Sequence, residues 1–324
     1  MSRIRDAIKR AEERAAGESV ESGMAPPGSA GQDGFAAPES VTRPSLSKGE
    51  GSIKRGGLLT AFAEQCPQTE WAPDPHTILF YGEEFRTPGS EEFRILRSRL
   101  DLVREAQPLQ TLLITSPMPG EGKTFVAANL AQVIVWQHER HVLLIDGDLR
   151  SSKLHQSLGV SATPGLSDYL KGDVDEFGVV RRGPLENFFF IPAGTAAPNA
   201  SELIGNGRLR MLLKRLAAAF DWIIIDSPPA IPVADARLIA ECCDGVLLVL
   251  QTGETPGDLA QLAYGEFRAK RFVGVVMNRV EPQSTYGYKY YYPKGNSISR
   301  ENGNRLKKLL RVDRTLRRSS SDRK

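Results

Sequence analysis

Apolar runs of six or seven residues alternate along the chain with longer segments of helical pattern. The runs are continuous rather than alternately apolar and polar, which is typical of strands covered on both faces. They lie at 111–116, 141–146, 187–192, 221–226, 245–251 and 272–278, with helical segments at about 122–137, 201–219, 233–242 and 257–270. Repeated strand–helix–strand units predict an α/β domain with a mostly parallel central sheet flanked by helices.

The first ninety residues lack this alternation. Residues 1–16 carry apolar side chains at helical spacing, which predicts a short amphipathic helix. Residues 17–57 are rich in Gly, Ser, Pro and Glu, a composition that buries too little surface to offset chain entropy. We therefore expect a disordered linker over 17–75, with order beginning between residues 58 and 80, and a folded domain over 76–281.

The end of the chain has a different composition. Residues 282–292 hold five of the eight tyrosines, and residues 293–324 form a basic tail. The tyrosine cluster could be a packed strand, a stacking platform or a set of hydroxyls that are modified. The basic tail could lie on an anionic membrane surface, bind an acidic partner or simply be solvated. The three cysteines, Cys66 and the adjacent Cys242 and Cys243, have no metal-ligand spacing, and no signal peptide or long apolar run is evident, so we expect a cytoplasmic protein with reduced thiols.

The segment TLLITSPMPGEGKT, residues 111–124, reads as a strand, a glycine-bearing loop and the start of a helix. A loop that wraps a phosphate with backbone N–H groups needs small residues, and Gly120 and Gly122 supply them. Lys123 can reach the β- and γ-phosphates, and Thr124 can bind Mg²⁺. Pro117 stands where the standard pattern has its first glycine, but the G-x-G-K-T core is in the expected context. The fold prediction is therefore of the P-loop NTPase type.

Two further strands end in acidic residues. Asp146 and Asp148 follow the run VLLI, and Asp226 follows WIII. Because the carboxyl ends of parallel strands meet at one edge of a sheet, we expect these carboxylates beside the phosphate loop. Carboxylates in that position can hold the Mg²⁺ shell and orient a nucleophile.

These motifs together resemble the bacterial tyrosine kinases, including the exosortase-associated type. The resemblance covers roughly residues 85–292 and is carried by SPMPGEGKT, VLLIDGDLR, DWIIIDSPPAIPVADA and the tyrosine cluster. Members of this family are ATP- and Mg²⁺-dependent autokinases of exopolysaccharide and capsule biosynthesis, related to the partition and septum-placement ATPases. The resemblance implies that activity for this chain.

The resemblance also implies roles residue by residue. The nucleotide would be bound by Pro119, Gly120, Glu121, Gly122, Lys123, Thr124, Phe125 and Arg150, and the metal by Thr124, Asp148 and Asp226. Lys123, Asp146 and Asp148 would be catalytic, and Asp146 would orient or deprotonate the attacking tyrosine. The phosphate acceptors would be Tyr286, Tyr288, Tyr290, Tyr291 and Tyr292.

The chain departs from the family pattern in two places. Ser152 stands where the family often has proline, and Asn199-Ala200 stands where it usually has Asn-Pro. Both positions lie outside the phosphate loop, so they bear on loop geometry rather than on the chemistry.

Glu91, Arg94 and Arg97 form an E-x-x-R-x-x-R motif on one helical face, just before the first strand. The residues alone suggest a solvated face or an intrahelical ion pair. In the family, this spacing mediates contacts in a ring of subunits. The resemblance therefore implies a homo-oligomeric ring in which the tail of one subunit enters the site of its neighbour. It also implies a separate membrane-bound polysaccharide co-polymerase as activator, which would recruit the protein to the inner face of the plasma membrane.

Two other function classes compete with the kinase. One is a partition-type ATPase that acts as a nucleotide-dependent switch, although that group usually has an early lysine where this chain has Met118. The other is a non-catalytic subunit whose basic tail binds nucleic acid. The sequence contains no recognisable module for reading nucleic acid, so we expect no specific nucleic-acid partner.

Overall fold

A computed structural model describes residues 55–66, 68–80, 89–137, 140–267 and 272–280. The chain divides into a first unit that ends at Arg279 and a second over Val280–Lys324, and all described residues except Val280 belong to the first. The predicted helix over 1–16, the tyrosine cluster and the basic tail lie outside the described residues. Among the helices that are described, none is long and apolar enough to cross a membrane.

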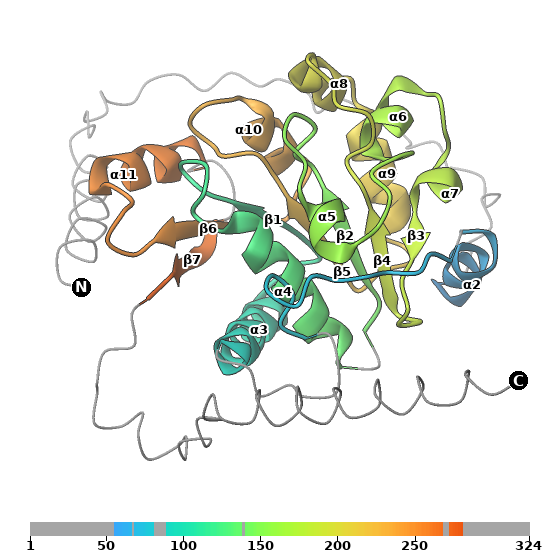
Figure 1. Ribbon diagram of the computed structural model, residues 1–324, viewed down its shortest axis with the longest axis horizontal. Coiled ribbons are helices and arrows are strands. Elements are labelled where there is room, and N and C mark those ends of the chain that lie inside the picture. The colour runs from blue at the N-terminus through green and yellow to red at the C-terminus, as the bar shows by residue number, and fades with distance from the viewer. Residues whose placement is uncertain (1–54, 67, 81–88, 138–139, 268–271, 281–324) are drawn as a thin grey trace, which may run out of the picture. The chain divides into compact units, whose positions relative to one another are not determined.

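The centre of the first unit is a seven-stranded sheet with the order β3-β4-β2-β5-β1-β6-β7 (Figure 1). The strands are β1 (Thr111–Thr115), β2 (Val142–Asp146), β3 (Arg181–Arg182), β4 (Phe188–Ile191), β5 (Trp222–Asp226), β6 (Gly245–Gln251) and β7 (Phe272–Asn278). Only the short edge strand β3 is antiparallel to its neighbour, which confirms the predicted mostly parallel sheet.

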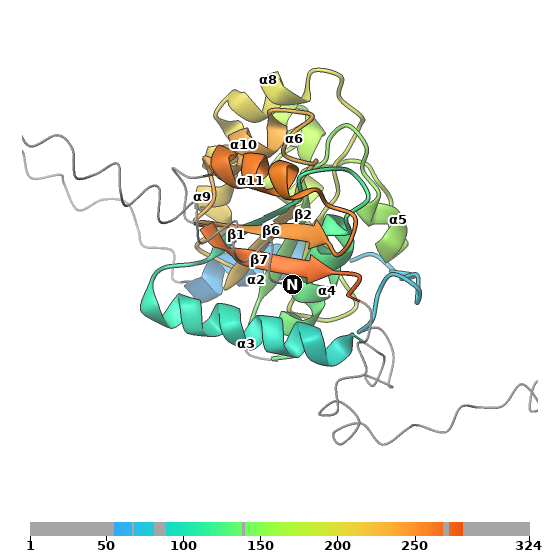
Figure 2. The same cartoon turned by 90° about the vertical axis from the view of Figure 1, so that its left-hand side faces the viewer.

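Helices cover both faces of this sheet. The longer ones are α2 (Arg55–Gln65), α3 (Ser90–Ala106), α4 (Lys123–Val135), α9 (Arg208–Leu216) and α11 (Gly257–Glu266). The shorter ones are α5 (Leu154–Leu158), α6 (Leu166–Lys171), α7 (Glu176–Val179), α8 (Ala200–Gly205) and α10 (Asp235–Ala240). Figure 2 shows α10 and α11 on one side of the strands and α3 on the other.

Each face has its own apolar core. On one face, α4 lies between the sheet and α3, and every residue from 126 to 135 is buried. On the other face, side chains of α2, α6, α8, α9, α10 and α11 pack against strands β2, β4, β5 and β6. The three layers leave the carboxyl ends of β1, β2 and β5 side by side at one edge, where ligands of such folds bind.

The predicted linker ends earlier than expected. Instead of disorder up to residue 75, the structure has helix α2 at Arg55–Gln65 followed by a segment packed on the domain. Phe62 is 1% exposed and lies 4.9 Å from the ring of Phe177, and Trp71 lies 5.0 Å from the ring of Phe188. Composition misses this boundary because a few large side chains, docked against a preformed core, supply the burial that the segment itself lacks.

One predicted helix is divided. The segment 201–219 forms α8 and α9, which are separated by Asn206 and Gly207. Gly207 has a φ of 85°, a left-handed conformation that ends one helix and starts the next at a new angle.

Candidate nucleotide-binding and catalytic site

The predicted phosphate loop connects β1 to α4. Gly120 and Gly122 have φ values of 88° and 96°, which lie in the left-handed region that favours glycine. Helix α4 begins at Lys123, so its first N–H groups and the positive end of its dipole are available to an anion. The strand, loop and helix lie in the order expected of a phosphate-binding loop.

Contacts from distant segments hold this loop in shape. The buried carboxylate of Glu121 accepts hydrogen bonds from the N–H of Met118 (2.8 Å) and from the hydroxyl of Thr255. The amide of Asn278, the last residue of β7, donates to the backbone oxygen of Glu121 at 2.9 Å. The Glu121 side chain therefore braces the loop from within. Motif spacing gave no indication of Thr255 or Asn278, which lie more than a hundred residues away in the chain.

Gly122 is required for a second reason besides its φ. A Cβ added to it would meet Nδ2 of Asn278 at 2.0 Å. The end of β7 thus packs directly against the phosphate loop, and a side chain at position 122 would displace the amide of Asn278 from its hydrogen bond to Glu121.

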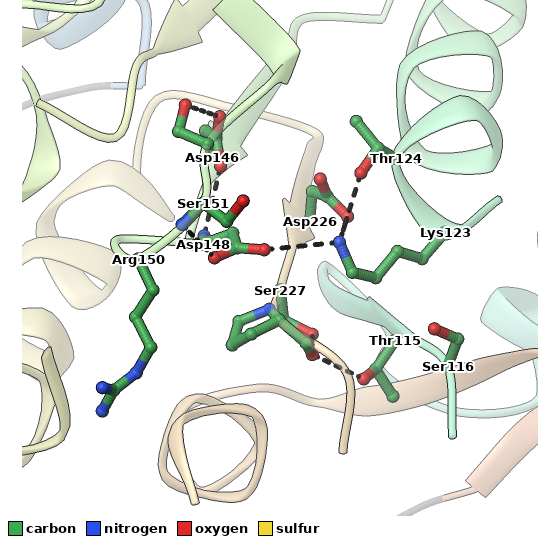
Figure 3. Close-up of polar contacts among 12 residues, drawn as sticks. Thr115, Ser116, Lys123, Thr124, Asp146, Asp148, Arg150, Ser151, Asp226 and Ser227 are labelled. Carbon is green, nitrogen blue, oxygen red and sulfur yellow. Dashed lines mark hydrogen bonds and ion pairs between the residues drawn. The ribbon is translucent and has the colours of Figure 1, made fainter. Parts of the chain in front are cut away.

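The predicted acidic residues lie around the ammonium group of Lys123 (Figure 3). Asp146 and Asp226 are paired in register on β2 and β5. Nζ of Lys123 lies 3.5 Å from Oδ2 of Asp148 and 3.9 Å from Oδ1 of Asp226, and it donates to the hydroxyl of Thr124 at 3.3 Å. The structure therefore brings together the lysine and the three aspartates that the sequence placed on separate motifs.

Burial and the neighbouring charges shift the pKa values of the side chains in this cluster. Burial by itself would lower the pKa of Lys123, but Asp226 and Asp148 outweigh it, so the pKa lies above its ordinary value. Burial, and then the charge of Asp226, raise the pKa of Asp146 to about 7. A carboxylate with such a pKa can exchange a proton near neutral pH, as a general base must.

Two hydrogen bonds fix the carboxylate of Asp146. Its Oδ1 accepts from the N–H of Asp148 at 3.1 Å, and its Oδ2 accepts from the hydroxyl of Ser152 at 2.7 Å. The same hydroxyl lies 2.9 Å from Nδ1 of His155. The sequence marked Ser152 only as a departure from a family pattern, and it gave no sign of His155.

The loop after β5 is bonded to the phosphate loop. The hydroxyl of Thr115 donates to the backbone oxygen of Pro228 at 3.1 Å, and the N–H of Ala230 donates to the backbone oxygen of Ser116 at 2.8 Å. These buried bonds set the distance between Lys123 and Asp226 because they join the two segments that carry them.

The residues of this cluster fit a bound Mg²⁺. Oδ1 of Asp226 is buried without a hydrogen-bond partner and has the ammonium of Lys123 only at 3.9 Å, so it keeps a free lone pair for a metal ion or a metal-bound water. The described part of the chain holds no group of three or more His, Cys, Asp or Glu side chains placed to bind a metal. Mg²⁺ does not need one, because it keeps several waters and binds through one or two carboxylates plus the phosphates of the nucleotide.

Two of the predicted nucleotide-binding side chains have other partners. The guanidinium of Arg150 points away from Lys123 in Figure 3 and pairs with the buried Asp235, with Nε to Oδ2 at 2.7 Å. It also donates to the hydroxyl of Ser201 at 3.0 Å, so Arg150 joins the end of β2 to α8 and α10. The ring of Phe125 lies 5.8 Å from that of Phe93 and holds α4 to α3. Pro119 is exposed at the tip of the loop.

The predicted oligomer motif lies on α3, and its residues have contacts within the chain. Glu91 and Arg94 form an ion pair at 2.9 Å, as the sequence alone suggested. Arg97 donates to the backbone oxygen of Val133 on α4 at 2.9 Å. Arg97 therefore also helps to hold α3 in place.

Comparisons with known proteins find a nucleotide-binding family and tyrosine kinases that are similar to this chain. The family described as "CobQ/CobB/MinD/ParA nucleotide binding domain" matches residues 112–294. The tyrosine-protein kinase YwqD of Bacillus subtilis is 32% identical over 209 residues, which cover 63% of this chain and 88% of that protein. The solved kinase domain of the Escherichia coli tyrosine kinase ETK is 32% identical and has a TM-score of 0.55, with 61% of this chain and 80% of that chain covered.

Other relatives are much longer than the matched part. EpsB of Ralstonia nicotianae is 36% identical over 208 residues, which cover 63% of this chain but only 27% of that protein. The chain therefore spans about a quarter of the length of this relative.

Proposed function

The chain belongs to the CobQ/CobB/MinD/ParA family of nucleotide-binding domains and to the bacterial tyrosine kinases within it, and we propose that it is an ATP-dependent protein-tyrosine autokinase. Its acceptors are Tyr286, Tyr288, Tyr290, Tyr291 and Tyr292, which are phosphorylated in trans within a ring of subunits. In this role it regulates exopolysaccharide polymerisation or export, at the inner face of the plasma membrane and with a membrane-bound co-polymerase as activator.

One observation carries the kinase proposal. The ammonium of Lys123 lies within 4 Å of carboxylates that end two neighbouring regions of the sheet, Asp148 at 3.5 Å and Asp226 at 3.9 Å. A cation at the start of a helix, next to acidic strand ends, is the arrangement that phosphoryl transfer needs. The tyrosine cluster supplies hydroxyls on the same chain, and neither competing function class has a use for them.

The side chains divide the chemistry among them. Lys123 and the first N–H groups of α4 bind the phosphates and draw charge from them. Asp146, fixed by its two hydrogen bonds, accepts the proton of the tyrosine hydroxyl as the oxygen attacks the γ-phosphate. The hydroxyl of Thr124 and the carboxylates of Asp148 and Asp226 would hold Mg²⁺, which neutralises charge on the phosphates.

The ring and its control form the second part of the proposal. Glu91 and Arg94 are 48% and 37% exposed at their side chains, so they remain accessible to a neighbouring subunit although they pair with each other. Each phosphate adds about −1.5 to −2 charge at pH 7. Several phosphates on one tail would repel the acidic strand ends, so phosphorylation releases the tail and weakens the ring.

Incubation of the purified protein with ATP and Mg²⁺, followed by mapping of phosphotyrosine, tests the activity. We expect label on the cluster, and no label on Lys123→Met. Membrane fragments that contain the activator are added in a parallel sample. Nucleotide hydrolysis without any tyrosine label in either sample would contradict the kinase proposal and favour a partition-type switch.

A variant with all five clustered tyrosines changed to Phe tests the control of assembly. We expect ATP to shift the parent towards smaller species in analytical ultracentrifugation and to leave the Phe variant assembled. Identical distributions of the parent with and without ATP would contradict the release of the ring by phosphorylation, but not the kinase activity.

A further inference from the structure

A chain of hydrogen bonds leads from the buried carboxylate of Asp146 to a histidine on α5. Ser152 lies in the loop after β2, and its hydroxyl is 2.7 Å from Oδ2 of Asp146 and 2.9 Å from Nδ1 of His155. Asp146 is fully buried, whereas Ser152 and His155 are half-buried. Only a short loop connects β2 to α5, so one segment, residues 146–155, supplies all three groups: the carboxylate, the hydroxyl and the imidazole.

The hydroxyl of Ser152 has a single proton, which decides which group donates in each of these two hydrogen bonds. When Asp146 is ionised, as it must be to accept the tyrosine proton, its carboxylate is an acceptor only, so the hydroxyl of Ser152 donates its single proton to that carboxylate. Its oxygen is then free to accept from His155, which requires the imidazole to carry its proton on Nδ1. The histidine therefore orients the hydroxyl, and the hydroxyl orients the carboxylate.

We propose that Ser152, held by His155, is a positioning residue for Asp146 in tyrosine phosphorylation. It fixes Oδ2 while the N–H of Asp148 fixes Oδ1, which sets the plane of the carboxylate towards the incoming hydroxyl. In the step that it serves, the tyrosine oxygen forms a bond to the γ-phosphorus, and the bond from that phosphorus to the bridging oxygen of ADP breaks. The tyrosine proton passes to Asp146.

Ser152 is one of the positions where this protein departs from the family pattern. The bacterial tyrosine kinases that the chain resembles often have proline in place of Ser152, and proline has no hydroxyl to donate. The contact between its Nδ1 and the hydroxyl of Ser152 connects His155 to the site. The inference rests on the proposed kinase function, because it assigns Ser152 a part in the reaction of that same site.

The decisive comparison is between Ser152→Ala and Ser152→Thr. Loss of a hydrogen bond to a charged group predicts a fall of about ten-fold or more in the rate of tyrosine phosphorylation at saturating ATP. The apparent KM for ATP should stay within about two-fold, since Ser152 does not contact the phosphate loop. Ser152→Thr keeps the hydroxyl and should retain most of the rate. Ser157→Ala, on the same helix as His155, is the matched control and should behave as the parent.

A double variant shows whether Ser152 acts through Asp146. In an Asp146→Asn background, Ser152→Ala should lower the remaining rate by less than about two-fold, because the group that it positions has been replaced. His155→Gln, whose amide can still donate, should retain more activity than His155→Phe. Melting temperature and ADP binding of each variant report whether it is folded.

The outcomes separate this inference from the kinase proposal. Suppose that the parent is phosphorylated, and that Ser152→Ala is folded and phosphorylated at the same rate. The positioning role is then wrong and the kinase function stands. The same holds if the effects of the two substitutions on the rate are additive in the double variant. If the parent itself is never labelled while it binds nucleotide, the proposed function fails first. If Ser152→Thr is as slow as Ser152→Ala, the hydroxyl is not the group that matters, and the inference is overturned.

Discussion

At the scale of single residues, burial decides the protonation of Asp146. Its pKa of about 7 in the folded protein exceeds the ordinary value of 3.8, so the folded state holds a proton that the unfolded chain releases. Stability contributed by this group is therefore full at low pH and is lost as pH rises from about 4 to about 7. Above pH 7 the folded protein carries a buried, ionised carboxylate.

Asp146→Asn removes that charge. We expect the variant to melt at a higher temperature than the parent at pH 8, and at nearly the same temperature at pH 4, in melts without nucleotide or Mg²⁺. Each 1 kcal/mol corresponds to about 2–4 °C in a domain of this size. Asp173→Asn, at an exposed position, is the control. A difference that does not grow between pH 4 and pH 7 would contradict the raised pKa.

The residues of the site differ in how far sequence could predict them. Lys123, Asp148 and Asp226 could be placed together because each follows a buried strand, and parallel strands end at one edge. The contacts of Ser152 and Asn278 could not, because they depend on which way a loop folds back and on side-chain rotamers. Neither has a sequence period or a fixed spacing.

At the scale of elements, the phosphate loop depends on its packing against β7. Gly122→Ala adds a left-handed strain and a clash at 2.0 Å with Asn278, whereas Gly120→Ala adds the strain alone, because nothing lies within 4 Å of its added Cβ. We expect the first to lower the melting temperature of the nucleotide-free protein clearly more than the second. Equal effects of the two substitutions would mean that Asn278 yields at little cost.

Helix α2 lies in the segment that the composition predicts to be a disordered linker. Phe62 is 1% exposed and packs on Phe177 and Phe220, so Phe62→Ala should destabilise the domain by about 3–5 kcal/mol. Glu64→Ala, at an exposed position of the same helix, should change stability by less than about 0.5 kcal/mol. Urea denaturation of both variants measures the difference. Two similar midpoints would indicate that α2 is docked only weakly.

Long, continuous apolar strands were the elements that sequence predicted best. Strands β6 and β7 have the predicted bounds, because each coincides with a continuous apolar run, although β6 is almost fully buried and the edge strand β7 only partly. The short elements α5, α6, α7 and β3 were not predicted. Each has six residues or fewer, which is too short to show a helical or strand period. They form where the connection between β2 and β4 folds over the sheet.

At the scale of the whole molecule, alanine substitutions at the three residues of the oligomer motif should differ in their effects on stability and on assembly. Arg97 donates to Val133 on α4, so Arg97→Ala should lower the melting temperature as well as any assembly. Glu91→Ala and Arg94→Ala break an exposed ion pair, which contributes little to stability. We expect them to dissociate the ring with unchanged melting temperature, as measured by light scattering and thermal melts. Full assembly of both variants would place the subunit contact elsewhere.

The length of the segment before the tyrosine cluster bears on whether phosphorylation occurs in cis or in trans. The last residue of β7, Asn278, bonds to the phosphate loop of its own subunit, and Tyr286 is seven positions after Arg279. Such a segment spans about 25 Å at most, at about 3.5 Å per residue. Its reach includes its own site, but a tether fixed beside the loop limits the direction of approach, and in-line transfer needs one direction. The tail of a neighbour has no such limit, so we expect transfer in trans.

Mixing two inactive partners tests this expectation. Lys123→Met keeps the tyrosines and lacks the phosphate-binding lysine, and the variant with five Phe keeps the site and lacks the acceptors. Each alone should stay unlabelled, and the mixture should label the tail of the Lys123→Met chain. The rate per chain of the parent should also rise with protein concentration below the point of assembly. An unlabelled mixture, together with a parent rate that is independent of concentration, would show that each subunit phosphorylates its own tail.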